Sequence, residues 1–280
     1  MDYDLIIIGS GPGGYVAAIR ASQLKMKVAV IEKAEIGGIC LNWGCIPTKS
    51  LLKSARVFDY LNHAADYGIT VSGEVKADFG AVIARSRSVA DGMSKGVQFL
   101  FRKNNITLIK GSGRLAGQNS VESVDADGNS KTLTAKHIIL ATGARSKELP
   151  NLKQDGEKII GYREAMTLPQ QPKSMVVVGS GAIGSEFANF YQSMGTEVTL
   201  VEFLPRIVPN EDEEVSKQLE RSFKKMKMKV MTDSSVESVD TSKEKCIVTI
   251  KTPKGTETVE TDIVFSAIGV ATNIQGKGLD

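Results

Sequence analysis

The chain alternates short, wholly apolar runs with longer stretches in which apolar residues recur every three or four positions. Residues 5–8 and 28–31 are apolar throughout, as is typical of strands buried on both faces of a parallel sheet. The alanine-rich stretch between them, to about Leu24, predicts a helix. Strand, helix and strand in this order predict a βαβ unit.

The same pattern returns in the second half of the chain, with apolar runs at 176–178 and 198–201 around a helical stretch that ends near Met194. In both copies a glycine-rich turn follows the first strand and a glutamate closes the second. Gly9 and Glu32 are separated by 32 − 9 = 23 positions, and Gly179 and Glu202 by 202 − 179 = 23. The sequence therefore predicts two copies of one nucleotide-binding plan.

A Gly-x-Gly-x-x-Gly turn in this context suits a dinucleotide. Its first glycine permits the tight turn, the second lets the backbone approach a pyrophosphate, and the third allows close packing of helix on strand. Amides at the start of the helix face the phosphates, and the closing acid accepts hydrogen bonds from a ribose. Two glycine turns without a ligand are the alternative, which is disfavoured because both copies keep every element. The expected contacts are Gly9, Gly11, Gly13, Gly14, Glu32 and Lys33 in the first copy, and Gly179, Gly181, Ala182, Ile183, Gly184 and Glu202 in the second.

Glu202 also indicates which nicotinamide nucleotide binds. A carboxylate at this position repels the 2′-phosphate of NADP, so NAD is expected. Arg206 is nearby, but it follows Pro205 and lies beyond the predicted strand end.

Further elements are predicted around these two units. Helices are expected at 51–61, 79–102 and 212–225, and strands at 106–109, 120–124, 131–134 and 137–140 and near residues 229, 236, 247, 256 and 263. Pro150 and the polar stretch to Lys158 suggest a boundary between domains at 1–150 and 151–280. The predicted fold class is α/β, with two Rossmann-like domains, each a parallel sheet with helices plus a small antiparallel β-meander.

Length and charge exclude several function classes. A chain of 280 residues suits about two domains. A net charge of 35 − 32 = +3 does not favour nucleic acid or a membrane surface as the main partner, and the apolar runs are too short to span a bilayer. Met1 stands almost directly before a predicted strand, which leaves no room for a signal or transit peptide. We therefore expect a soluble, cytoplasmic protein.

Cys40 and Cys45 are the sharpest chemical feature of the sequence. At a helix start, cysteines five positions apart could form a disulfide, and the helix N-terminus stabilises a thiolate. Unreactive burial and half of a metal site are the alternatives, but no second Cys/His pair at ligand spacing occurs, and His63 and His137 stand alone. Redox chemistry is favoured and no metal is expected. Cys246 lies in an alternating run that predicts a half-buried strand.

Residues 37–49, Gly-Gly-Ile-Cys-Leu-Asn-Trp-Gly-Cys-Ile-Pro-Thr-Lys, resemble the redox-active signature of the flavin-dependent disulfide reductases, the class I pyridine nucleotide-disulfide oxidoreductases. Leu-Asn and Ile-Pro-Thr-Lys are closest to the dihydrolipoamide dehydrogenases within that family. Glutathione and mercuric reductases usually have Val-Asn-Val and Val-Pro, and they use NADP. The resemblance extends in order along the whole chain to 267–273, where Val270 replaces the more frequent arginine and puts a polar contact near the nicotinamide in doubt.

The resemblance implies the cofactors and the residue roles. FAD is expected on the first glycine turn and NAD on the second. Cys40 is the expected interchange thiol, Cys45 the charge-transfer thiol, and Lys49 the lysine near the flavin, paired with Glu186; a surface i,i+4 contact is the alternative role of Lys49. The other implied cofactor contacts are Gly38, Gly113, Ala141, Thr142, Gly143, Val236, Ala267, Ile268 and Gly269.

The implied activity passes electrons from dihydrolipoamide through Cys40 and Cys45 and FAD to NAD. Implied partners are the lipoyl groups of 2-oxo acid dehydrogenase complexes or of the glycine cleavage H protein, and a second subunit in a homodimer. The family's Gly-Asp flavin contact and its interface domain, with a His-Glu pair, have no counterpart here, so we expect a truncated chain with little lipoamide turnover. Another flavin disulfide reductase and a nucleotide-binding fragment without turnover are the alternative functions.

Overall fold

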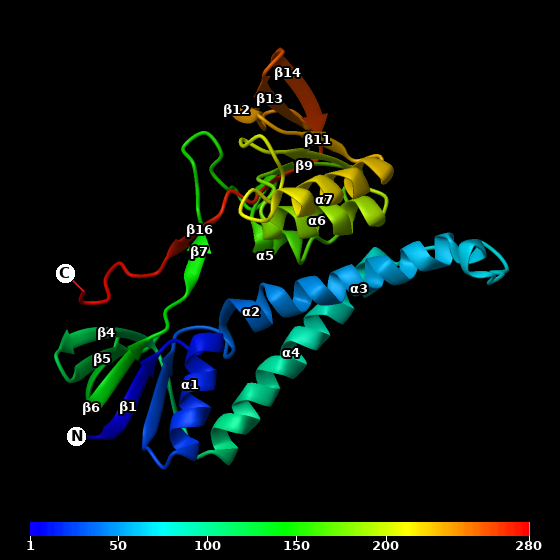
Figure 1. The fold of residues 1–280 in the computed structure, drawn as a ribbon. Helices are drawn as coiled ribbons and strands as arrows, with labels where there is room; N and C mark the ends of the chain where they lie inside the picture. The colour runs from blue at the N-terminus through cyan, green and yellow to red at the C-terminus, as the bar shows by residue number, and fades with distance from the viewer. Residues whose placement is uncertain (280) are drawn as a thin grey trace. The chain divides into compact units, whose positions relative to one another are not determined.

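The computed structural model describes residues 1–279, which form two compact units (Figure 1). Unit 1 comprises residues 1–47, 87–145 and the segment from Ala271 onward, and unit 2 comprises residues 48–86 and 146–270. Each unit is thus assembled from separate stretches of the chain. The division into domains near residue 150 stays a prediction, and the compact units follow a different division.

Unit 1 contains a six-stranded sheet in the order β3-β2-β1-β6-β5-β4. Its strands are β1 (Tyr3–Ile8), β2 (Val28–Glu32), β3 (Thr107–Lys110), β4 (Ser112–Gly117), β5 (Ser120–Val124) and β6 (Ser130–Leu140). The pairs β2–β3, β1–β2 and β1–β6 are parallel, whereas β4–β5 and β5–β6 are antiparallel. A parallel half and an antiparallel half therefore share one strand, β6.

The expectation of separate strands at 131–134 and 137–140 is wrong, because β6 runs through both. Its first part pairs with β5, up to Ser120 opposite Thr134, and its last part pairs with β1, from Tyr3 opposite Ala135. The partner changes at this point without a turn, so the polar Lys136 interrupts the apolar pattern but not the strand.

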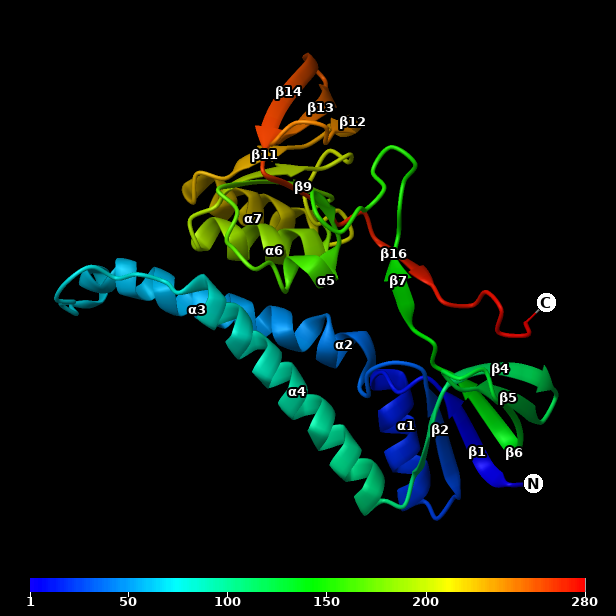
Figure 2. The ribbon, with the colours of Figure 1, turned by 180° about the vertical axis from the view of Figure 1, so that it is seen from behind.

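Helix α1 (Pro12–Gln23) lies along β1 and β2 of this sheet (Figure 2). Unit 1 also contains α2 (Gly38–Asn42) and parts of α3 (Cys45–Asn62) and α4 (Phe79–Lys103). Leu5 and Ile7 pack with Val97 and Phe101 in one core cluster, while Ile6 and Ile8 belong to another with Val121 and Leu133. Burial on both faces explains why the first strand is apolar at every position. The predicted helices at 51–61 and 79–102 are confirmed within α3 and α4.

Unit 2 contains a parallel sheet in the order β11-β10-β9-β15-β8. Its strands are β8 (Ile159–Ile160), β9 (Ser174–Val178), β10 (Glu197–Val201), β11 (Lys229–Met231) and β15 (Ile263–Ser266), with helices α5 (Tyr162–Ala165), α6 (Ala182–Ser193) and α7 (Glu213–Lys225). Phe187 of α6 packs edge-on against Phe265 of β15, with ring centroids 4.9 Å apart. The Asp212 side chain accepts from the amide of Glu214 and caps α7, which ends as the sequence predicts.

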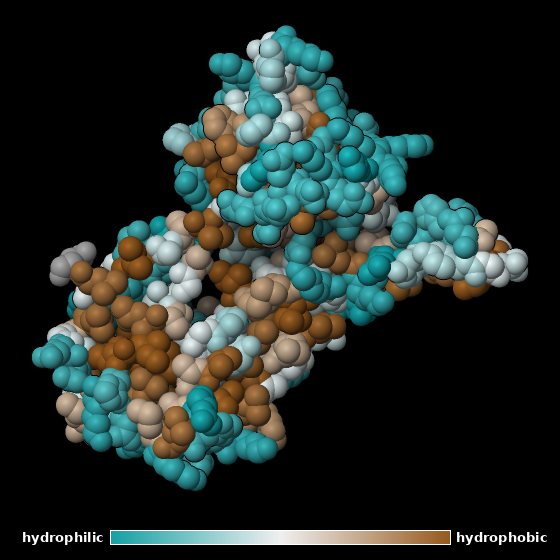
Figure 3. Space-filling view, in the orientation of Figure 1, coloured by the Kyte–Doolittle hydropathy of each residue, from teal (hydrophilic) through white to brown (hydrophobic). Residues whose placement is uncertain are grey.

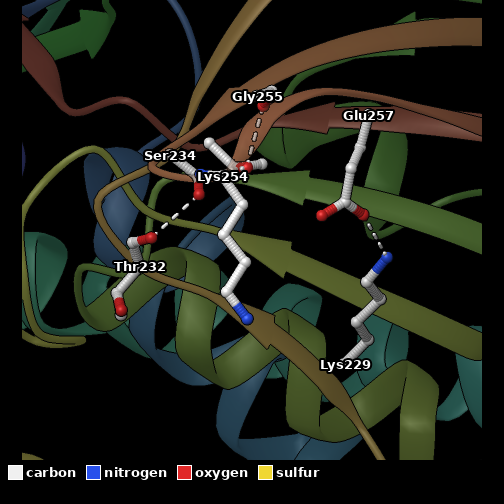
Figure 4. A network of polar contacts seen from close by, with 7 residues as sticks. Lys229, Thr232, Ser234, Lys254, Gly255 and Glu257 are labelled. Atoms are coloured by element: carbon white, nitrogen blue, oxygen red, sulfur yellow. Dashed lines mark hydrogen bonds and ion pairs between the residues drawn. The ribbon is translucent and has the colours of Figure 1, made fainter.

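A three-stranded antiparallel meander completes unit 2, formed by β12 (Ser235–Asp240), β13 (Cys246–Thr252) and β14 (Gly255–Thr261). Figure 4 shows how polar contacts link it to the sheet edge: Lys229 of β11 lies 3.1 Å from Glu257 of β14. Cys246 is fully buried in β13, where burial raises the pKa of its thiol. The α/β class with parallel sheets and small antiparallel meanders is therefore confirmed.

The remaining elements are a 3-10 helix at Ala64–Tyr67 and the two-stranded pairing of β7 (Ala144–Ser146) with β16 (Val270–Thr272). Across residues 1–279, the structure contains no helix that combines the length and the apolar character needed to cross a membrane. Figure 3 shows hydrophobic surface over the part of the molecule that contains the sheet of unit 1. Ile139 and Leu140 of β6 are among the exposed large hydrophobic residues.

Candidate nucleotide sites and redox pair

The glycines of the first loop are required by close backbone packing. Gly9 has φ +103°, and a Cβ there would lie 2.2 Å from the carbonyl oxygen of Ala141. A Cβ on Gly14 would lie 1.9 Å from the oxygen of Gly9. The first and third glycines therefore hold strand, turn and helix together. At Gly11 the nearest atom to such a Cβ is the Cα of Gly38, at 4.0 Å, so space remains beside the start of α1.

The loop of unit 2 repeats this packing. Gly179 has φ +95°, and its Cβ would lie 2.5 Å from the oxygen of Ala267, while a Cβ on Gly184 would lie 1.8 Å from the oxygen of Gly179. A Cβ on Gly181 would meet no atom within 4 Å. Helix α6 begins at Ala182, directly after that open position, and its first-turn amides have no helical partners. Open space beside a helix N-terminus fits the pyrophosphate of a dinucleotide in both loops.

Glu32 at the end of β2 and Glu202 directly after β10 brace the two glycine loops through equivalent hydrogen bonds. Glu32 Oε2 accepts from the Ser10 amide at 2.8 Å and from the Ser10 hydroxyl at 2.7 Å. Glu202 Oε2 accepts from the Ser180 amide at 2.8 Å and from its hydroxyl at 2.6 Å. The role of both serines was not predicted from the sequence, although each directly follows the first glycine of its copy.

The other oxygen of each acid binds the backbone two residues further on. Glu32 Oε1 accepts from the Ala34 amide and Glu202 Oε1 from the Leu204 amide, both at 2.9 Å. A carboxylate has about four lone-pair sites, so each acid retains acceptor capacity for ribose hydroxyls. The two acids are thus fixed in orientation before any nucleotide binds.

Glu202→Gln is expected to lower the free energy of unfolding by about 1–3 kcal/mol, because a glutamine cannot accept at both ends and leaves a buried donor unpaired. We expect it also to weaken NADH binding. Chemical denaturation and NADH fluorescence titration measure the two effects. Glu257→Gln is the matched control, since its partner Lys229 is half exposed. Equal unfolding midpoints for the two variants would contradict the bracing role.

The strand ends beside the first glycines have equivalent geometry in the two units. The Ala141 amide donates to the oxygen of Ile8, and the Ala267 amide to that of Val178, both at 2.8 Å. Gly143 and Gly269, two residues later, have φ values of +67° and +111°. The structure therefore brings the predicted contacts Ala141, Thr142, Gly143, Ala267, Ile268 and Gly269 to the side of each loop where the first glycine lies.

Gly113, a predicted flavin contact, is hydrogen-bonded to Lys277, a residue that was not predicted from the sequence. Its Cβ would lie 3.0 Å from the Ile8 side chain, and its carbonyl accepts from Lys277 Nζ at 3.1 Å. Burial lowers the pKa of Lys277 and Lys33 lowers it further, whereas Glu32 raises it. A lysine thus lies in the electrostatic field of the predicted adenosine contacts, and the sequence carried no pattern that pointed to it.

The cysteine segment packs on the loop of unit 1. A Cβ on Gly38 would lie 2.7 Å from the Cα of Gly11, and the Gly37 amide donates to the oxygen of Ser10 at 3.2 Å. Cys40 is half buried in α2, and Cys45 is exposed as the first residue of α3. A Cβ on Gly44 would lie 3.3 Å from the Cα of Cys40, so the residue before Cys45 lies directly against Cys40.

Lys49 and Glu186 form an ion pair within unit 2, which confirms the expected pairing. Lys49 lies one helical turn after Cys45 on α3, and Glu186 lies two residues after Gly184 on α6. Their side chains are 61% and 31% exposed, so solvent screens the pair and its contribution to stability is small.

Val236 lies in the meander, where its side chain packs against a core cluster and its carbonyl accepts from Asn151. Its role as a cofactor contact stays a prediction. Within residues 1–279, no group of three or more His, Cys, Asp and Glu side chains is arranged to hold a metal ion.

Two glycine loops with the same packing, and a cysteine segment packed on one of them, are the features expected of a nucleotide-dependent disulfide oxidoreductase. Residues 3–280 match the family model described as pyridine nucleotide-disulphide oxidoreductase, and the chain belongs to this family. This is a family of flavin- and nicotinamide-nucleotide-binding proteins, and its dihydrolipoyl dehydrogenases use FAD and NAD, the two cofactors that the sequence predicts.

The chain is also similar to individual proteins of known name. The chain is 47% identical over 279 residues to a dihydrolipoyl dehydrogenase of Zymomonas mobilis, covering 99% of this chain and 60% of that protein. It is 46% identical over 296 residues to one of Rhizobium etli, covering 99% and 61%. A crystal structure of LpdA from Mycobacterium tuberculosis matches with a TM-score of 0.90 at 29% identity, covering 98% of this chain and 60% of that one. The chain therefore spans about three fifths of the length of these relatives.

Proposed function

We propose that this chain is the two-nucleotide part of a dihydrolipoyl dehydrogenase, which oxidises dihydrolipoyl groups and reduces NAD. Residues 1–150 would hold FAD and residues 151–280 NAD. The observation that carries this proposal is the asymmetry between two otherwise equal loops. Both have the same glycine packing and the same serine–glutamate brace, but the Cys40 segment packs on the loop of unit 1.

The proposed chemistry begins with thiol–disulfide exchange. Dihydrolipoamide and the oxidised Cys40–Cys45 pair exchange two electrons and two protons, which leaves lipoamide disulfide and two cysteine thiols. FAD, when bound, supplies the carrier through which these two electrons reach NAD⁺ as hydride. In keeping with the resemblance, Cys40 exchanges with the lipoyl group and Cys45 faces the flavin.

The positions of the two cysteines support these roles. Cys45 is the first residue of α3 and is exposed, so its sulfur is open to a cofactor that approaches the start of this helix. Cys40 lies inside the short helix α2 and is half buried. Lys49 would be held by Glu186 with its ammonium near the flavin, so the ion pair serves orientation rather than stability.

The NAD preference rests on Glu202. This acid is buried and already fixed by Ser180 and Leu204, so it is not free to turn away from a 2′-phosphate. The repulsion therefore disfavours NADP. The full-length protein would act on lipoyl groups of 2-oxo acid dehydrogenase complexes or of the glycine cleavage H protein, as a homodimer in the cytoplasm.

The visible spectrum of the FAD-loaded chain tests the proposal. One equivalent of dihydrolipoamide is expected to produce a long-wavelength charge-transfer band, which requires a cysteine thiolate against the flavin. Reduced glutathione in its place should react more slowly. A flavin that bleaches without this band would contradict the assigned cysteine roles, and a faster reaction with glutathione would contradict the substrate.

A further inference from the structure

We propose that Arg87 and Trp43 are positioning residues that clamp the loop between the two cysteines and thereby set the redox equilibrium of the pair. The inference rests on the proposed function of Cys40 and Cys45 as a dithiol/disulfide couple. Both residues lie in unit 1, and neither belongs to the glycine loop or to the cysteine pair.

The loop has little conformational stability of its own. Helix α2 is only five residues long, and Trp43 and Gly44 alone separate its end from Cys45. A backbone hydrogen bond of 2.7 Å from the Trp43 amide to the oxygen of Ile39 is a local contact at this point. Helices this short are not stable by themselves, so contacts from outside decide where the loop lies.

Arg87 supplies such contacts from α4. Its guanidinium lies over the Trp43 ring, 4.1 Å from the ring centroid, in cation–π geometry. Arg87 also donates to the carbonyl of Asn42 at 2.6 Å. One side chain thus holds two consecutive residues at the carboxyl end of α2, where a cation is favoured by the helix dipole.

The edge of the Trp43 ring is held as well. Its indole N–H donates to Glu35 Oε1 at 3.0 Å, so the ring is fixed by a cation on its face and by a carboxylate at its edge. Trp43 is the single tryptophan of the chain. Its emission therefore reports directly on this loop.

The beginning of the segment is anchored separately. The buried Asn42 amide donates to the carbonyls of Ile36 and Gly38 at 3.0 and 2.9 Å, and the Ser94 hydroxyl donates to Ile36 at 2.8 Å. These contacts fix the backbone before Cys40. The clamp formed by Arg87 and Trp43 fixes the backbone between Cys40 and Cys45, which is the part that must stay in place when the disulfide opens.

Keeping the backbone between Cys40 and Cys45 fixed in the reduced protein shifts the redox equilibrium towards the disulfide. A disulfide loses stability relative to its dithiol when reduction releases a flexible loop, because the open form gains conformational entropy. A clamped loop gains little conformational entropy when the disulfide is reduced. Without the clamp, a reagent dithiol would open the Cys40–Cys45 bond more completely, giving two cysteine thiols and one oxidised reagent.

Arg87→Met tests the clamp, with Arg85→Met as the matched control. Arg85 lies two positions earlier on α4 and donates to Ser50 and Ser54 of α3 instead of to the loop. Each variant is equilibrated with dithiothreitol buffers, and free thiols are counted by alkylation and mass measurement. We expect Arg87→Met to shift the equilibrium towards the dithiol about fivefold, or about 20 mV less negative, and Arg85→Met to stay within about twofold of the parent chain.

Trp43→Leu removes the ring without changing charge and should shift the equilibrium in the same direction. This second variant keeps the test open if Arg87→Met folds poorly. The indole emission of Arg87→Met should also change, whereas that of Arg85→Met should not. These results would support the clamp.

Two results would overturn the clamp. In one, Arg87→Met and Arg85→Met have the same redox equilibrium. In the other, Arg87→Met shifts towards the disulfide in a pH-dependent way, which would mean that the guanidinium acts by its charge on a thiolate. Failure of the parent chain to form any reversible disulfide would instead contradict the proposed function, and the two failures are thus distinguishable.

Discussion

Replacing Cys45 by alanine is expected to abolish electron entry from dihydrolipoamide, with the rate of flavin reduction falling on the order of 10³-fold or more. The remaining Cys40 is a lone thiol, so the variant has no disulfide between residues 40 and 45 that could accept the two electrons of dihydrolipoamide. Cys45 is exposed at the start of α3, so its side chain contributes little to packing and the variant should fold normally. Stopped-flow reduction of the FAD-loaded chain by dihydrolipoamide measures the loss.

Two comparisons make this experiment specific. NADH should reduce the flavin of Cys45→Ala as fast as that of the parent chain, because hydride transfer from NADH bypasses the cysteines. Cys246→Ala is the matched cysteine control, since that thiol is fully buried in β13 and burial raises its pKa. Unchanged reduction of Cys45→Ala by dihydrolipoamide, or an equal loss in Cys246→Ala, would contradict the assignment of the redox pair.

Gly184→Ala is expected to lower the stability of unit 2, whereas Gly181→Ala is expected to weaken NADH binding without lowering stability. At Gly184 the added Cβ would lie 1.8 Å from the carbonyl oxygen of Gly179, so alanine there should destabilise unit 2 by about 3 kcal/mol or more. At Gly181 the Cβ meets no atom of the protein within 4 Å, and the unfolding transition should not shift downward. The same methyl group would occupy the space that we propose for the pyrophosphate, so NADH should bind roughly 5–150-fold more weakly.

Thermal unfolding and NADH fluorescence titration separate the two effects. Gly92→Ala, in the open interior of α4, controls for the general benefit of alanine in a helix and should affect neither NADH affinity nor folding adversely. Normal NADH affinity in Gly181→Ala would show that the nucleotide does not approach this loop.

The nucleotide-binding plan could be predicted from the sequence because backbone packing permits glycine alone at several of its positions. Gly9, Gly14, Gly179 and Gly184 would each bring a Cβ within 2.5 Å of a carbonyl oxygen. The requirement for glycine is therefore visible in the local sequence, although at Gly9 and Gly179 the carbonyl oxygen belongs to a distant residue, Ala141 or Ala267. The pairing of Lys49 with Glu186 was also anticipated, although only by resemblance, because the two residues are 137 positions apart.

Other features depended on contacts that local pattern does not encode. The strand β6 continues through Lys136 because β5 and β1 pair with successive parts of it, and no single-strand pattern shows a change of partner. Arg87 is one of many charged residues on a helical surface, and nothing in its neighbourhood marks it as the residue that holds Trp43. The bracing serines Ser10 and Ser180 are different, because comparison of the two copies position by position would have found them.

The interleaving of the two units has a consequence for the order in which a newly made chain matures. Synthesis at about 5–20 residues per second delivers the segment from Ala271 only after every stretch of unit 2. The last ties of unit 1, from Asn273 to Gly143 and from Lys277 to Gly113, therefore form after unit 2 can close. At this rate the residues after 270 take about 0.5–2 s, so unit 1 gains its last contacts about that long after the final stretch of unit 2 has been made. Under the proposed function, unit 1 would therefore complete its flavin site after unit 2 has completed its NAD site.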